Sequence, residues 1–92
     1  MTQKSEEEVQ IGNRLGLHAR AAAKFVHVAN GFKARIAVAK DSTRVDGKSI
    51  LGLLTLAASR GTRLRLHAEG EDAEAAVRAL VDLVRSRFGE DD

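Results

Sequence analysis

Cysteine is absent from this 92-residue chain, which excludes disulfides and thiolate metal sites. Tryptophan and tyrosine are also absent and only three phenylalanines occur, so the core must be aliphatic. No apolar run approaches the roughly 20 residues of a membrane-spanning helix. A chain of this length forms one domain with a thin core, and we expect that domain to cover residues 1–92.

The chain also has little net charge, because 15 Lys and Arg residues stand against 13 Asp and Glu residues. This excess is too small to indicate a nucleic-acid binder by itself. The segment Met1–Glu8 is polar and acidic, unlike a secretory signal peptide. We therefore expect a cytoplasmic protein that binds neither nucleic acid nor membrane.

Alternating apolar and polar residues predict four short strands, each with one buried face. They lie at residues 8–11, 33–38, 43–45 and 63–68. Apolar residues at helical spacing predict three helices, at residues 19–29, 50–58 and 73–88. The order β-α-β-β-α-β-α favours a two-layer α+β sandwich, in which the helices cover one face of the sheet.

The other face of the sheet should be wet. On the first and fourth strands it would carry Glu6, Glu8, Gln10, Arg63, Arg65 and His67. If these strands are neighbours, acids and bases pair across the sheet, and each pair contributes roughly 0.2–1 kcal/mol. The basic residues would then be structural.

A weaker alternative is a small nucleic-acid binder. It would use four basic residues of the sheet: Lys33, Arg35, Arg63 and Arg65. These strands lack the aromatic side chains on which bases stack, and the acids of the first strand would cancel part of the field.

The segment from Gly16 to Arg20 places His18 at the predicted start of the first helix. Helix starts offer unpaired backbone N–H groups and the positive end of the helix dipole, and both favour an anion. His18 could therefore carry a phosphoryl group that the backbone and Arg20 help to hold. No carboxylate lies near His18 in the sequence to orient it as a general base. A surface histidine at a helix start explains the spacing equally well, so both interpretations stay open.

The three histidines do not predict a metal site. His18 and His27 would lie on opposite sides of one helix, and His67 lies on the wet face of the sheet. A zinc site is therefore not expected. Arg20, Ala23 and His27 share one stripe of the first helix that could face a partner, although a solvated face is the commoner explanation.

The second predicted helix has too many apolar residues for one buried stripe. Leu53 and Leu56 can point inward, and this leaves three residues partly outside: Ile50, Leu51 and Leu54. An exposed apolar patch of this kind indicates a partner surface.

Ser49 precedes this helix and is a good N-cap residue, which by itself explains its presence. A phosphate on Ser49 would add about two negative charges at a helix N-terminus, beside the apolar patch. It could therefore switch partner binding without unfolding the protein.

Two longer motifs carry a resemblance to a known family. Asn13–Val26 resembles the active-site segment, and Asp46–Leu56 the regulatory serine segment, of HPr. HPr is the histidine-containing phosphocarrier of the bacterial phosphoenolpyruvate-dependent phosphotransferase system (PTS). Residues 60–62 and 68–73 are also similar to this family, so the resemblance covers roughly residues 6–88.

The resemblance implies an open-faced β-sandwich with a four-stranded antiparallel sheet of order 1-4-2-3, covered on one face by three helices. It implies a carrier rather than an enzyme, with no cofactor. His18 would accept a phosphoryl group on Nδ1 from phospho-enzyme I and pass it to a histidine of a PTS A component. The phosphoryl oxygens would be stabilised by the Arg20 side chain and by the backbone N–H groups of Ala19, Arg20 and Ala21.

The same resemblance implies a surface on which donor and acceptor both dock. It would comprise Arg20, Ala23, His27, Lys48, Ile50, Leu51 and Leu54. Ser49 would be the target of an HPr kinase/phosphorylase, and phosphoserine there would disfavour docking of enzyme I. We expect the carrier to be a monomer.

Ala21 departs from the family pattern, which usually has proline after the arginine. Alanine leaves φ free and adds an N–H donor that could reach a bound phosphate. The alternative function is a regulatory or interaction module that works through Ser49 phosphorylation and partner binding while His18 is idle. The presence of both His18 and Arg20 favours the carrier.

Overall fold

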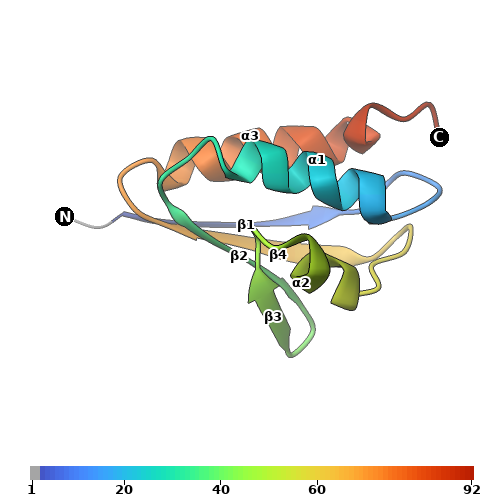
Figure 1. Ribbon diagram of the computed structural model, residues 1–92, viewed down its shortest axis with the longest axis horizontal. Helices are drawn as coiled ribbons and strands as arrows, with labels where there is room; N and C mark the ends of the chain where they lie inside the picture. The colour runs from blue at the N-terminus through green and yellow to red at the C-terminus, as the bar shows by residue number, and fades with distance from the viewer. Residues whose placement is uncertain (1–2) are drawn as a thin grey trace.

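The fold is a four-stranded antiparallel sheet with helices packed on one face (Figure 1). In the computed structural model, residues 3–92 are described. The elements are β1 (Lys4–Gln10), α1 (Ala19–Ala29), β2 (Arg35–Lys40), β3 (Thr43–Asp46), α2 (Ile50–Thr55), β4 (Arg63–Glu69), α3 (Ala73–Arg85) and the short 3-10 turn η1 (Arg87–Gly89). The strand order β1-β4-β2-β3 confirms the order 1-4-2-3 that the resemblance implies.

The core lies between the sheet and the helices α1 and α3, which lie side by side above it in Figure 1. Alternate residues of β2 and β4 point into it, as the period of a strand requires. These are Ile36, Val38, Leu64, Leu66 and Ala68, all buried. Each helix contributes one apolar stripe, so helix and sheet bury one another's apolar face. The helix α2 packs against α1 and β3. No helix within residues 3–92 is long and apolar enough to cross a bilayer.

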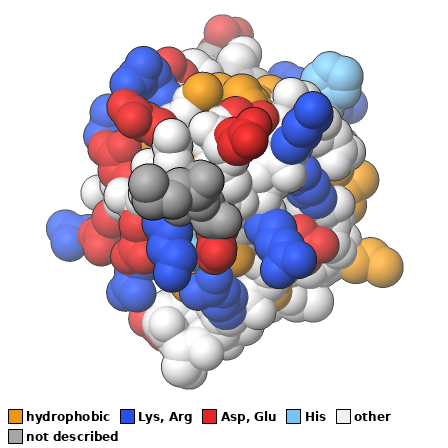
Figure 2. Space-filling model, turned by 90° about the vertical axis from the view of Figure 1, so that its left-hand side faces the viewer, with side chains coloured by type: hydrophobic (Ala, Val, Ile, Leu, Met, Phe, Trp, Pro, Cys, Tyr) orange, Lys and Arg blue, Asp and Glu red, His pale blue; other side chains and the backbone are white. Residues whose placement is uncertain are grey.

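The open face of the sheet carries paired charges, as the alternation predicts. Arg63 lies 3.6 Å from a carboxylate oxygen of Glu8. Glu6 lies 3.7 Å from Arg65 and 3.3 Å from His67. Figure 2, which views the left-hand end of Figure 1, shows Lys and Arg side chains beside Asp and Glu side chains on part of that end. The acidic residues of β1 thus pair with the basic residues of β4, so these basic residues have a structural role.

Two helix ends differ from the prediction. The helix α2 ends at Thr55 rather than near Ala58, because Ala57 takes a left-handed φ of 49° and Lys40 binds the carbonyl of Leu56 at 3.0 Å. The helix α3 ends at Arg85, so Phe88 is not on its stripe. Phe88 is nevertheless buried, because the chain turns back after the helix and returns the ring to the core.

Asp72 precedes α3, where the sequence places it beside the positive end of the helix. Its carboxylate makes no cap hydrogen bond to α3. It accepts instead from the backbone N–H groups of Lys33 and Ala34, both at 2.8 Å. These bonds, that of Lys33 first, hold the pKa of Asp72 below its usual range. The β4–α3 turn is thereby tied to the start of β2.

Candidate functional site

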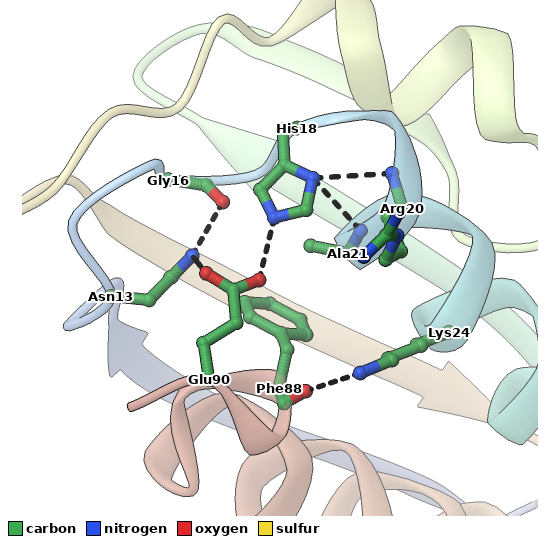
Figure 3. A network of polar contacts seen from close by, with 8 residues as sticks. All are labelled: Asn13, Gly16, His18, Arg20, Ala21, Lys24, Phe88 and Glu90. Carbon is green, nitrogen blue, oxygen red and sulfur yellow. Dashed lines mark hydrogen bonds and ion pairs between the residues drawn. The ribbon is translucent and has the colours of Figure 1, made fainter. Parts of the chain in front are cut away.

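His18 is the N-cap of α1 and not a residue of its first turn. Its Nδ1 faces the backbone N–H groups of Arg20 at 3.2 Å and Ala21 at 3.4 Å (Figure 3). Because both partners donate, Nδ1 must accept and carries a lone pair. The ring is 27% exposed, so this nitrogen is fixed by the helix start while its surroundings stay open to a reactant.

The other ring nitrogen meets a carboxylate from the far end of the chain. Nε2 of His18 lies 2.5 Å from Oε2 of Glu90, which is 72 residues away in sequence. Oε1 of Glu90 accepts from Nδ2 of Asn13 at 3.0 Å, and the same amide donates to the carbonyl of Gly16 at 2.8 Å. Figure 3 shows the carboxylate between the two side chains. The pKa of Glu90 is lowered, first by the hydrogen bond with His18 and then by that with Asn13.

Glu90 reaches the ring because the segment after α3 reverses direction. Arg87, Phe88 and Gly89 all have left-handed φ, of 58°, 56° and 78°. Phe88 is 1% exposed, and its carbonyl accepts from Nζ of Lys24 on α1 at 2.7 Å. Sequence reasoning missed this carboxylate, since local spacing cannot join residue 90 to residue 18. The one sequence feature that pointed to this contact was the acidic segment after the large apolar residue Phe88.

The loop that carries His18 is seated on the segment after α2. Leu17 donates its N–H to the carbonyl of Ala58 at 2.9 Å. Gly16 has a φ of +68°, and a Cβ there would lie 2.5 Å from the same carbonyl oxygen. Only glycine fits this approach, so the motif glycine two residues before His18 has a steric reason.

A cavity of about 380 Å³ opens beside the ring. Three cations border it: Arg14 from the loop, and Arg20 and Lys24 from α1. A larger hollow of about 720 Å³ lies over β2 and β3, and its wall includes Lys33, Arg35, Lys48 and His67. The cavity beside His18 is the one that borders the predicted phosphoryl acceptor. Among residues 3–92, no three His, Asp or Glu side chains are grouped so as to hold a metal ion.

The comparisons with known proteins agree with this geometry. A family model described as the PTS HPr component phosphorylation site matches residues 5–86. The chain belongs to the HPr family. HPr of Neisseria meningitidis is 48% identical over 85 residues, which cover 92% of this chain and 96% of that protein. HPr of Pseudomonas aeruginosa is 51% identical over 84 residues, or 90% of this chain and 93% of that one.

Solved HPr structures share the fold. One HPr from Thermoanaerobacter tengcongensis has a TM-score of 0.92 at 48% identity, and it covers 96% of this chain and 99% of its own. HPr from Bacillus anthracis has a TM-score of 0.84 at 42% identity, over 88% and 96% of the two chains. The protein is thus an HPr phosphocarrier of the PTS, a carrier rather than a classical enzyme.

The remaining predicted surface residues of this HPr lie on α1 and around the start of α2. Arg20, Ala23 and His27 are exposed on α1. Ile50 and Leu51 are 41% and 77% exposed, while Leu54 is half-buried, and Leu53 and Leu56 point into the core as expected. Leu15, in the loop three residues before His18, is also 64% exposed.

Ser49 is the N-cap of α2, as its residue type predicts. Its Oγ accepts from the N–H of Gly52 at 3.0 Å. Lys48 beside it turns its ammonium to the carbonyl of Phe32 at 2.7 Å, and the backbone N–H of Lys48 donates to Asp46. The hydroxyl is partly exposed at a helix N-terminus, next to the apolar residues of α2.

Acid should weaken the fold through Glu90. A carboxyl whose pKa is lowered on folding contributes stability that is complete above its unfolded value of about 4.3. This stability is lost as the pH falls through the lower folded pKa of Glu90. The Glu90→Gln variant is therefore expected to lose less unfolding free energy than the unaltered protein between about pH 5 and about pH 3, measured by urea unfolding.

The control is Asp91→Asn, which removes one charge from the exposed neighbour of Glu90. It should keep the acid dependence of the unaltered protein. Equal slopes for Glu90→Gln and the unaltered protein would show that the contact with His18 does not persist in solution.

Proposed function

We propose that this HPr accepts a phosphoryl group on Nδ1 of His18 from phospho-enzyme I and transfers it to a histidine of PTS A components. The observation that carries the proposal is the direction of Nδ1. Its lone pair faces the first-turn N–H groups of α1, where the helix start favours an anion.

The transfer needs no movement of a proton on the ring. The N–P bond to the donor histidine breaks as a bond from phosphorus to Nδ1 forms, and Nε2 keeps its hydrogen toward Glu90. Once Nδ1 is occupied, the N–H groups of Arg20 and Ala21 can donate to phosphoryl oxygens instead. Ala21 supplies a donor that proline in its place would lack. The exposed Arg20 side chain adds positive charge at the same end of α1.

Donor and acceptor would dock on the face that surrounds the ring. We assign to it the exposed or half-buried residues Leu15, Arg20, Ala23, His27, Lys48, Ile50, Leu51 and Leu54. Its centre is apolar and its edge is basic, a composition suited to partners with apolar and acidic surfaces.

Phosphorylation by a cognate enzyme I tests the proposal. The protein is incubated with phosphoenolpyruvate and enzyme I, and the adduct is mapped by mass spectrometry under basic conditions. We expect one acid-labile phosphoryl group on His18, which then passes to an A component. If a competent enzyme I gives no adduct, the carrier function is wrong, and the protein is better described as a regulatory module in which His18 is idle.

Ser49 is proposed as a regulatory phosphorylation site for an HPr kinase/phosphorylase. A phosphate there would place about two negative charges beside the apolar residues of α2 and weaken docking of enzyme I. It would also keep an acceptor at the helix N-terminus, so the fold would persist.

The variant Ser49→Ala separates the structural from the regulatory role. Loss of the cap to Gly52 is expected to reduce the unfolding free energy by about 0.5–2 kcal/mol. Acid-stable phosphate from ATP and the kinase should disappear, while phosphorylation of His18 continues. The matched control is Thr55→Ala, which removes a second hydroxyl of α2, one that donates to the carbonyl of Gly52. This variant should still take up acid-stable phosphate. Uptake by Ser49→Ala equal to that of the control would show that the kinase acts elsewhere.

A further inference from the structure

We propose that the C-terminal tail, residues 86–92, completes the phosphoryl-accepting centre and that Glu90 is the positioning residue of His18. This inference rests on the proposed function of His18. Glu90 acts through the ring and makes no contact with the phosphoryl group.

The hydrogen-bond pattern around the ring admits one neutral tautomer. Nδ1 faces two N–H donors, so it must accept. Nε2 faces the Glu90 carboxylate, which can only accept, so Nε2 must donate. The proton is therefore held on Nε2, and Nδ1 keeps the electron pair that attacks phosphorus. Without Glu90, only the two longer N–H contacts would select this tautomer.

The tail that carries this carboxylate is held at three places. Asn13 is fully buried, and its amide orientation is fixed because Nδ2 faces two acceptors, the Gly16 carbonyl and Oε1 of Glu90. Lys24 binds the carbonyl of Phe88 two residues before Glu90. The N–H of Arg14 donates to the carbonyl of Asp92 at 2.9 Å, two residues after it. The tail is thus fastened before, at and after the residue that touches His18.

This arrangement also favours the charged form of the product. When Nδ1 carries the phosphoryl group and Nε2 keeps its hydrogen, the ring is cationic and Glu90 lies against the N–H. In the transfer onward, the electron pair of the N–P bond returns to Nδ1 and leaves a neutral imidazole. The other charged groups at this cavity are Arg14, Arg20, Lys24, Asp91 and Asp92. Of the three acids at this cavity, Glu90, Asp91 and Asp92, only Glu90 makes a hydrogen bond with the ring in the described part of the chain.

Nitrogen chemical shifts of the His18 ring test the positioning role without any phosphoryl transfer. In the full-length protein at neutral pH we expect a protonated Nε2 and an unprotonated Nδ1. In Glu90→Ala both shifts should move toward the average of exchanging tautomers. Glu90→Gln, whose amide oxygen can still accept, should fall between the two. Asp91→Asn, which removes a tail charge that does not touch the ring, should match the unaltered protein.

The pH dependence of phosphohistidine hydrolysis supplies the second readout. Loss of the carboxylate charge, which lies against the N–H of the cationic phosphorylated ring, is expected to move the midpoint of the acid-dependent hydrolysis rate to lower pH in both Glu90 variants. A purely structural tail would leave this midpoint unchanged, and thermal unfolding of each variant checks that the fold persists.

Two failures can be told apart. If the unaltered protein takes up phosphoryl groups but the Glu90 variants keep its nitrogen shifts and its midpoint, the positioning role is overturned and the carrier function stands. If the unaltered protein takes up none on His18, the carrier function falls, and the role of Glu90 in transfer falls with it.

Discussion

Replacement of His18 by alanine is expected to reduce phosphoryl uptake from phosphoenolpyruvate and enzyme I by roughly a thousandfold or more, to below detection. The other two histidines cannot substitute for it. His27 is exposed in the last turn of α1, far from the helix start, and His67 lies on the open face of the sheet against Glu6. Neither ring faces the free N–H groups of a helix N-terminus. The measurement is acid-labile radioactive phosphate on the protein at equal enzyme I.

His18→Asn is the sharper form of this experiment. Asparagine is a favoured N-cap residue, so its side chain can still accept from the first turn of α1 and preserve the helix start. It offers no ring nitrogen for phosphorus. The variant His67→Ala, on the open face of the sheet, serves as the control and should retain uptake within a few-fold. Phosphate uptake by His18→Asn comparable to that of His67→Ala would show that the phosphoryl acceptor is not His18.

Phe88→Ala is expected to cost about 3–5 kcal/mol of unfolding free energy, the range for a buried phenylalanine. The ring is 1% exposed and lies in the core cluster, although it belongs to the turn after α3. Its loss should also release the tail, because Phe88 anchors the three left-handed residues that aim Glu90 at His18. Urea unfolding at neutral pH gives the free energy, and the nitrogen shifts of His18 report the tail.

Leu51→Ala is the control for this substitution. It also shortens a large apolar side chain, but at a position that is 77% exposed, so the change should stay within about 0.5 kcal/mol. A cost below about 1 kcal/mol for Phe88→Ala would mean that the tail is not packed in solution as the buried ring requires.

Periodicity predicted the elements that depend on local spacing. The inward residues of β2 and β4, the apolar stripes of α1 and α3, and the outward placement of Ile50 and Leu51 all follow from periods of two or 3.6 residues. The pairing of β1 acids with β4 bases followed from the order of the strands. His18 could be singled out because glycine and a helix start lie next to it in the chain.

Glu90 and Asp72 could not be found in this way, because their partners lie far along the sequence. Glu90 contacts His18 because Arg87 and Phe88 adopt a left-handed backbone conformation that residues other than glycine rarely take. Asp72 resembles a helix cap by position, yet its carboxylate accepts two hydrogen bonds from the N–H groups of Lys33 and Ala34, just before β2. In both cases tertiary packing decides between local options of similar energy.

The fastening of the tail has a practical consequence for fusion proteins. The carbonyl of Asp92 binds the N–H of Arg14, so any polypeptide joined after Asp92 would emerge beside the His18 cavity. It would compete with enzyme I for space there. The start of β1 lies at the opposite end of the molecule from η1 (Figure 1). Affinity tags, fluorophores and surface-immobilisation handles for kinetic work on this carrier therefore belong before β1.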